Sequence, residues 1–270
     1  MPKKDLKIIF IGDINGKIGR ETIKKEIPGI KKKYAPDLII ANADNIAHGK
    51  GATENTVKEL MKYGIEFFTS GDHCFDQLNS IKDVYNDMLP TIRPLNYSVK
   101  APGKGYDIIN TPKGDVLVIN LIGRVFMRRD YECPFILCED LIKKLENIKF
   151  SAIIIDIHAE ATSEKIALKH YFDGKVSAIL GTHTHVMTAD ETISAKGTAY
   201  ISDVGMTGAA DGILGVDKEN IIESFITQIK APHVIPVKGK SIMNCVLITV
   251  DSKSSKALKI ESIIKKVTIN

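Results

Sequence analysis

The chain has 270 residues, of which 44% are hydrophobic and 26% are charged. This composition can bury one large core, so we expect a single domain spanning residues 1–270. The net charge of +4 comes from 37 basic and 33 acidic residues, which is too small a difference to favour nucleic-acid binding through overall charge. Any affinity for phosphate groups must therefore arise locally.

The sequence predicts a soluble, cytoplasmic protein that does not enter the membrane. Residues 1–5 are basic, but the apolar run at 8–11 is too short for a secretory signal. Nowhere do about eighteen apolar residues follow one another, as a membrane span requires. No C-x-x-C pair occurs, which favours reduced thiols over a disulfide framework. The four cysteines are Cys74, Cys133, Cys138 and Cys245.

Short runs of β-branched residues alternate with helical segments as far as Asp190, and such alternation predicts an α/β fold. The expected strands cover residues 7–11, 38–41, 67–69, 116–121, 152–157 and 178–180. The expected helices, with apolar residues near the helical period, cover residues 21–34, 54–63, 137–145 and 163–170.

Beyond Asp190 the pattern changes to strands that pair across short connections. Residues 191–194 and 198–202 flank the turn at 195–197, and residues 244–250 precede residues 258–264. Pairs of this kind are antiparallel. The sequence therefore predicts a mixed sheet, or two packed sheets, with helices outside.

Polar side chains follow five of the predicted strands at the point where each strand ends. In chain order they are Asp13, Asp44, Asp72 with His73, His158, and His183 with His185. The carboxyl edge of a sheet is where ligand sites form in α/β folds. A single Asp here is most often a turn or capping residue, and a single His is most often structural. The repetition over five strand ends is what predicts a metal site.

The most specific local signal is the H-x-H pattern of His183 and His185. In an extended loop after a strand, both imidazoles can reach neighbouring ions while the residue between them points away. Mixed Asp and His ligands suit transition metals. We expect two ions, iron or manganese first, with zinc or magnesium as alternatives, bridged by a carboxylate and a hydroxide that attacks a phosphoester. His73, next to a ligand, would then be the general acid.

Several motifs resemble those of the calcineurin-like metallophosphoesterases, and in particular of the bacterial YmdB-like phosphodiesterases. The resemblance runs nearly from end to end of the chain. It is carried by residues 11–13 (IGD), 45–51 (NIAHGKG), 93–96 (RPLN), 158–165 (HAEATSEK), 181–186 (GTHTHV) and 203–208 (DVGMTG), with Asp211 and Gly212 soon after.

The resemblance implies a fold, a set of ligands and a substrate class. The family fold is a β-sandwich core flanked by helices on both sides, and its members assemble into homo-oligomers. Its substrates include 2′,3′-cyclic nucleotides. The candidate substrates of this chain are therefore small phosphoesters, cyclic nucleotides among them, and RNA-derived ends. The implied roles are Asp13, Asn45 and His185 on the first metal, Asp72, His158 and His183 on the second, Asp44 bridging both, and His73 as proton donor.

Two positions depart from the family pattern. Asp44 stands where the family usually has Glu, and Asp72 stands where it usually has Asn. The shorter bridge requires a small backbone shift, and the added carboxylate should bind the metals more tightly while weakening their Lewis acidity. These changes bear on rate and metal preference more than on the existence of the site.

Two other interpretations remain open at this stage. A zinc amidohydrolase also uses H-x-H, but there the pattern usually opens the ligand set, whereas here Asp13 opens it. A metal-binding regulatory or scaffolding protein with weak or no turnover is the second. Among other polar residues, His48 and Lys50 could reach a phosphate, and a solvated loop is an equally good interpretation of them. Arg124 could also contact phosphate, but a surface Arg is the more ordinary interpretation. Residues 31–33 are expected to form a solvated basic face of a helix. No role is assigned to His170 and His233.

Overall fold

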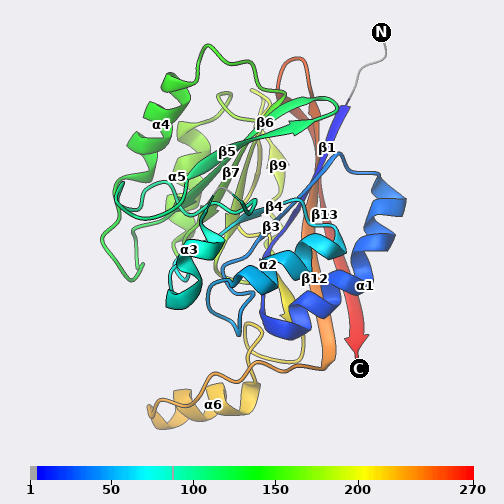
Figure 1. Cartoon of the computed structure of the whole chain (residues 1–270), viewed down its shortest axis with the longest axis vertical. Helices are drawn as coiled ribbons and strands as arrows, with labels where there is room; N and C mark the ends of the chain where they lie inside the picture. Colours follow the sequence, from blue (N-terminus) through cyan, green and yellow to red (C-terminus); the bar gives the residue numbers. More distant parts are fainter. Residues whose placement is uncertain (1–4, 87) are drawn as a thin grey trace.

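The computed structural model describes residues 5–86 and 88–270, and its strands form two sheets that face each other (Figure 1). The seven-stranded sheet has the order β2 (Asp13–Ile14), β11 (Met206–Ala209), β12 (Gly239–Asp251), β1 (Asp5–Ile11), β3 (Leu38–Asn42) and β4 (Phe67–Thr69), with β13 (Lys256–Ile269) paired to β12. The six-stranded sheet has the order β5 (Tyr106–Thr111), β6 (Gly114–Ile122), β7 (Ala152–His158), β8 (Ala178–Thr182), β10 (Ala199–Ile201) and β9 (Thr192–Ile193).

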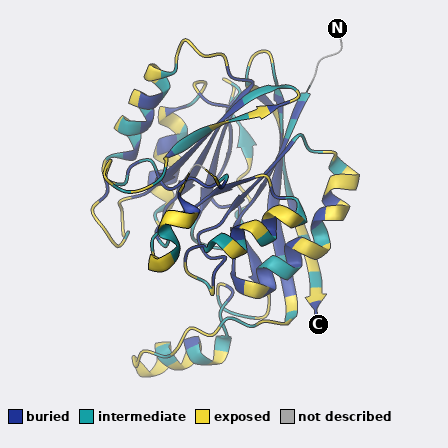
Figure 2. Cartoon of the chain, viewed as in Figure 1, coloured by how far each residue is buried: buried dark blue, intermediate teal, exposed yellow. Residues whose placement is uncertain are grey.

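Alternation along the strands sends their side chains into two different layers. In β1, Ile8 and Phe10 pack between the sheets, whereas Ile9 and Ile11 face the helices. The layer between the sheets also contains Val116 of β6 and Ile154 of β7, so both sheets contribute to it. The strands are accordingly the most buried part of the chain (Figure 2).

Helices cover both outer faces of this sandwich (Figure 1). On the seven-stranded sheet, α1 (Gly16–Tyr34) and α2 (Glu54–Tyr63) bury their apolar stripes. On the six-stranded sheet, α4 (Pro134–Lys144) and α5 (Thr162–Tyr171) do the same. The expected α/β class, with a β-sandwich flanked by helices on both sides, is confirmed. No helix among the described residues is long and apolar enough to cross a membrane.

The antiparallel pairs expected in the last third are also present. β9 pairs with β10, and β12 pairs with β13 over a much longer stretch than the sequence indicated. The remaining helices are the short η1 (Leu78–Ser80) and α3 (Ile81–Val84), followed late in the chain by α6 (Lys218–Thr227). No sequence pattern predicted α6, which projects from the end of the sandwich and is largely exposed (Figures 1 and 2).

The first helix begins five residues earlier than expected, at Gly16 instead of residue 21. The reason is packing: a Cβ on Gly19 would lie 2.5 Å from the carbonyl oxygen of Thr207 in β11. Glycine is therefore required for the close approach of helix to strand, although in a sequence it reads as a helix breaker.

Candidate metal centre

The strand ends singled out from the sequence meet at one edge of the sandwich. β1, β3 and β4 are parallel neighbours in one sheet, and β7 and β8 are parallel neighbours in the other. Their carboxyl ends therefore point the same way within each sheet, and the loops that follow them converge. This brings together residues that are far apart in the sequence, such as His183 and Asp13, 170 residues apart, whose backbone N–H and Oδ2 form a hydrogen bond of 3.1 Å.

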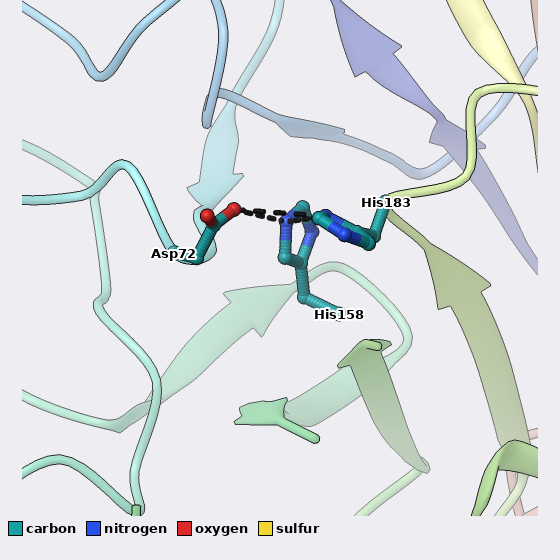
Figure 3. Close-up of side chains that lie close together, drawn as sticks. All are labelled: Asp72, His158 and His183. Carbon is teal, nitrogen blue, oxygen red and sulfur yellow. Dashed lines mark hydrogen bonds and ion pairs between the residues drawn. The ribbon is translucent and has the colours of Figure 1, made fainter. Parts of the chain in front are cut away.

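Asp72, His158 and His183 form the tightest group (Figure 3). His158 Nε2 lies 3.3 Å from Asp72 Oδ1 and 3.0 Å from His183 Nδ1, and His183 Nδ1 lies 3.6 Å from Asp72 Oδ1. Gly71 makes this arrangement possible, because a Cβ there would lie 2.2–2.5 Å from ring atoms of His158.

Asp44 joins this group from the side of β3. Its Oδ2 lies 3.4 Å from His158 Nε2, and its two carboxylate oxygens accept the backbone N–H of His73 at 3.0 and 3.2 Å. Asp44, Asp72 and His73 also bring one potential ligand atom each within 4.8 Å of one another. Asp44 therefore lies within reach of the Asp72 and His158 group, despite being one methylene shorter than the usual Glu.

Asp13, Asn45 and His185 form a looser set beside it. His185 Nε2 lies 3.8 Å from Asp13 Oδ1, and the other ring nitrogen, Nδ1, donates to the carbonyl oxygen of Leu214 at 3.0 Å. That hydrogen bond leaves Nε2 as the free nitrogen facing Asp13. Asp13 is buried, and Asn45 and His185 line the cavity above it.

A chain of hydrogen bonds fixes the tautomer of His158. The Thr182 hydroxyl donates to Asp156 Oδ1 at 2.7 Å, so Thr182 Oγ1 must accept from His158 Nδ1 at 3.0 Å. Nδ1 therefore carries the proton, and Nε2 is the nitrogen available to a metal. Burial raises the pKa of Asp156 to about 6, against the lowering effects of His158, Thr69, Thr182 and Asn42.

A buried ion pair holds the H-x-H loop in place. Lys165 Nζ donates to the carbonyl oxygen of Thr182 at 2.8 Å and to Asp203 Oδ2 at 3.0 Å. The same carboxylate oxygen accepts both the backbone N–H (3.0 Å) and the hydroxyl (2.7 Å) of Thr184. The two histidines on either side of Thr184 have positive φ, 95° for His183 and 65° for His185. Such a backbone persists only when the surroundings enforce it.

The charges of the buried groups are mutually dependent. Burial opposes the charged form of His158, but Asp44 and Asp72 raise its pKa well above the ordinary value. Burial also raises the pKa of Asp44, whereas hydrogen bonding and charge from His158 outweigh burial and lower the pKa of Asp72. Burial, followed by the charge on His158, lowers the pKa of His183 to about 3.

The residues present fit divalent metal ions. Ligands at about 2.1 Å from an ion lie about 3.0–3.4 Å from one another, which matches the closest separations around His158 Nε2. Asp13 Oδ1 and Asn45 Oδ1 are buried side-chain oxygens without a hydrogen-bond partner. Because a buried acceptor is costly to leave unsatisfied, both oxygens have the character of open ligand positions.

His73 lies at the rim of the centre and is oriented by Asp76. Its Nδ1 is 2.7 Å from Asp76 Oδ2, and its Nε2 is 4.0 Å from Asp72 Oδ2. Arg128, which the sequence did not single out, lies 3.3 Å from Asp72 Oδ2 through its Nε. It places a positive charge next to the carboxylate that departs from the usual Asn.

A cavity of about 810 Å³ opens above these side chains. Its lining includes His73, His183, His185 and Asn45, and also His48, Lys50 and His233. Other residues considered from the sequence are exposed outside this cavity, namely Arg124, His170 and residues 31–33. Arg124 contributes a backbone N–H to Glu164 (2.9 Å). The cysteines are free, and burial raises the pKa of Cys74 well above its ordinary value.

Sequence reasoning missed the residues that orient the others. They are Asn42, Asp76, Arg128, Asp156, Glu160, Lys165, Thr182 and Asp203. Glu160, for example, lies 3.2 Å from His183 Nε2 and so leaves Nδ1 facing Asp72. The motifs that carried the family resemblance were the one available signal for some of these residues, since they contain Glu160, Lys165, Thr182 and Asp203.

Comparison with known proteins gives consistent results. A family model described as YmdB-like protein matches residues 9–263. The 2′,3′-cyclic-nucleotide 2′-phosphodiesterase of Bacillus subtilis (strain 168) is 44% identical over 259 residues, which are 96% of this chain and 97% of that protein. A crystal structure described as a novel phosphatase of Mycoplasma pneumoniae is 34% identical with a TM-score of 0.92, covering 100% of this chain and 95% of that one. NAD nucleotidase (NadN) of Haemophilus influenzae, 12% identical, shares the fold alone with a TM-score of 0.62, over 98% of this chain and 56% of that one.

Proposed function

This chain belongs to the YmdB-like protein family, and from that membership and the geometry of its site we propose that it is a metal-dependent phosphodiesterase that hydrolyses 2′,3′-cyclic nucleotides. The observation that carries the proposal is the convergence of Asp44, Asp72, His158 and His183 beneath the cavity. The relative from Bacillus subtilis, named for that activity, supports the substrate class. The cyclic 2′,3′ ends of RNA fragments carry the same group and are proposed as further substrates.

We assign the ligands in two sets that share Asp44. Asp13, Asn45 and His185 would hold one ion, and Asp72, His158 and His183 the other, with iron or manganese preferred and zinc or magnesium as alternatives. Two such ions, when bound, supply an activated water as nucleophile and neutralise charge on the phosphate. The ordering of His158 by Thr182 and of His185 by Leu214 supports this assignment, because each leaves Nε2 free toward the centre.

The chain's own residues would then control the proton and the approach of the substrate. His73, held by Asp76, would donate a proton to the ribose oxygen as it leaves. Lys50 and Arg128 line the cavity and place positive charge where an anionic diester enters. His73, Lys50 and Arg128 all line the cavity. This supports an enzyme that turns over a substrate more than a purely regulatory metal site.

Three further proposals concern the protein as a whole. We propose that residues 1–270 act as one domain, which the core shared between the two sheets supports. We propose a homo-oligomer, supported by large apolar side chains exposed on and after α6, such as Ile222 (46%) and Ile229 (71%). We also propose a cytoplasmic location, which the free cysteines support because thiols stay reduced there.

The proposal is tested by hydrolysis of 2′,3′-cyclic AMP after chelation and after addition of Mn²⁺ or Fe²⁺. We expect chelation to abolish turnover and either ion to restore it. Hydrolysis that is indifferent to chelation would refute the metal-dependent mechanism. Binding of two ions without turnover of any phosphodiester would instead support the regulatory alternative.

A further inference from the structure

The cavity above the metal centre extends to a part of the chain with no assigned role. We call residues 211–238 the α6 segment; it comprises α6, the loop before it and the extended chain after it. This segment leaves the sandwich after β11 and returns to β12 (Figure 1). About half of the residues that line the cavity belong to it.

The cavity lining combines two kinds of chemistry. The metal-centre side chains His183, His185 and Asn45 contribute to it, and Lys50 and Arg128 add cationic groups. The α6 segment contributes apolar side chains, together with the potential hydrogen-bond donors Lys230 and His233. The apolar residues are Ile213, Leu214, Val216, Ile221, Phe225 and Ile235. A ligand that matches this lining has an anionic group for the metal centre and an apolar part with polar edges for the α6 segment.

The α6 segment is attached to the metal centre by direct contacts. The Leu214 carbonyl oxygen accepts from His185 Nδ1 at 3.0 Å and from Asn15 Nδ2 at 3.3 Å. Ile235 packs so closely against the loop at Gly49 that a Cβ there would lie 2.2 Å from its Cδ1. The position of the apolar wall is therefore fixed relative to the metal ligands.

Phe225 is the one phenyl or phenol ring among the described residues that line this cavity, and its side chain is 76% exposed. We propose that the α6 segment binds the nucleobase of the substrate, with the base stacked on Phe225 while the cyclic phosphate lies over the metal centre. This inference rests on the proposed function. An exposed phenyl ring gains from stacking on a base, whose heteroatoms can meanwhile accept hydrogen bonds from Lys230 and His233.

The dimensions favour a nucleotide over a protein partner. A volume of about 810 Å³ is typical of small-molecule pockets, which commonly bury most of a ligand of that size. The pocket is continuous with the metal ligands, so its occupant must reach them. The neighbouring Ile226, 73% exposed but outside the cavity lining, provides a matched control on the same helix.

The test compares Phe225→Ala, Phe225→Tyr and Ile226→Ala in the metal-loaded full chain. Turnover is measured with 2′,3′-cyclic AMP and with ribose 2′,3′-cyclic phosphate, which has the same reacting group and no base. The preference for the nucleotide is the ratio of its kcat/KM to that of the substrate without a base. Loss of one stacking contact should reduce this ratio by about 5- to 150-fold. Phe225→Tyr should keep that preference, and Ile226→Ala should match the unaltered protein.

Calorimetric binding of adenosine to the same proteins gives a readout that does not depend on turnover. We expect Phe225→Ala to weaken it and Ile226→Ala to leave it unchanged. An unaltered protein that shows no preference for the base, or equal effects of both alanine variants, would overturn the subsite. Absence of hydrolysis with adenosine binding still dependent on Phe225 would refute the proposed function and leave the subsite standing.

Discussion

Replacing Lys165 by Met should strongly destabilise the protein and loosen the H-x-H loop. Lys165 is 0% exposed and its partner Asp203 1%, so the substitution leaves a buried carboxylate without its cation. Breaking a buried pair in this way costs about 3–5 kcal/mol of unfolding free energy. Asp203 keeps the donors of Thr184 and Gly205, which places the expected loss near 3 kcal/mol. For a chain of this size that lowers Tm by about 6–12 °C.

The function should suffer as well, because Lys165 also supports the carbonyl oxygen of Thr182, next to His183. Loss of groups that orient ligands typically weakens metal binding by about 10- to 100-fold. Both quantities can be measured, by calorimetric melting and by metal titration. Lys143→Met is the matched control, since Lys143 pairs with Glu139 at 3.1 Å but is 64% exposed. Its effect on the unfolding free energy should be far smaller than that of Lys165→Met, because an exposed ion pair contributes little.

The double variant with Lys165→Met and Asp203→Asn shows whether the unpaired charge of Asp203 causes the loss of stability. Removing the uncompensated charge should recover part of the stability lost in the single variant, with a coupling of about 0.5–3 kcal/mol. The reasoning fails if Lys165→Met behaves like Lys143→Met, or if the double variant is as unstable as the sum of its single changes.

Three further substitutions separate metal binding from proton transfer. His73→Ala should retain both metals while slowing turnover about 10²–10⁴-fold, more for 2′,3′-cyclic AMP than for bis-p-nitrophenyl phosphate, whose leaving group needs no acid; equal defects would reassign His73. Asp44→Asn should lower metal content at both positions, because one bridging charge is lost to two ions; full retention would show that Asp44 is no bridge. Gly71→Ala should displace the His158 ring and reduce metal content, whereas Gly29→Ala, with nothing within 4 Å of an added Cβ, should not; equal metal content in the two variants would contradict the packing argument.

The strands and the convergence of their ends could be predicted from the sequence because both follow from local chemistry. Buried strands such as β3 contain short apolar runs with β-branched residues, and the polar residues that follow each run closely are visible at once. Parallel order then brings Asp44 and Asp72 to one edge without further information. The grouping of these side chains therefore required only the fold class.

What the sequence did not reveal depends on contacts distant in the chain. α6 buries only Ile221, and its N-cap residue Asp217 makes no side-chain capping bond, so the usual signals of a helix are weak. Lys165 has the spacing of an ordinary helix residue, and only the approach of Asp203, 38 residues later, makes it a buried ion pair. The apolar wall of the cavity was missed for the same reason.

The most direct test of the central claim is a crystal structure of the Mn²⁺-loaded protein with anomalous diffraction data at the manganese edge. The proposed centre predicts two peaks about 3.5–4 Å apart, one beside Asp13 and His185 and one beside Asp72, His158 and His183, with Asp44 between them. A single peak, or peaks away from these side chains, would contradict the two-metal site.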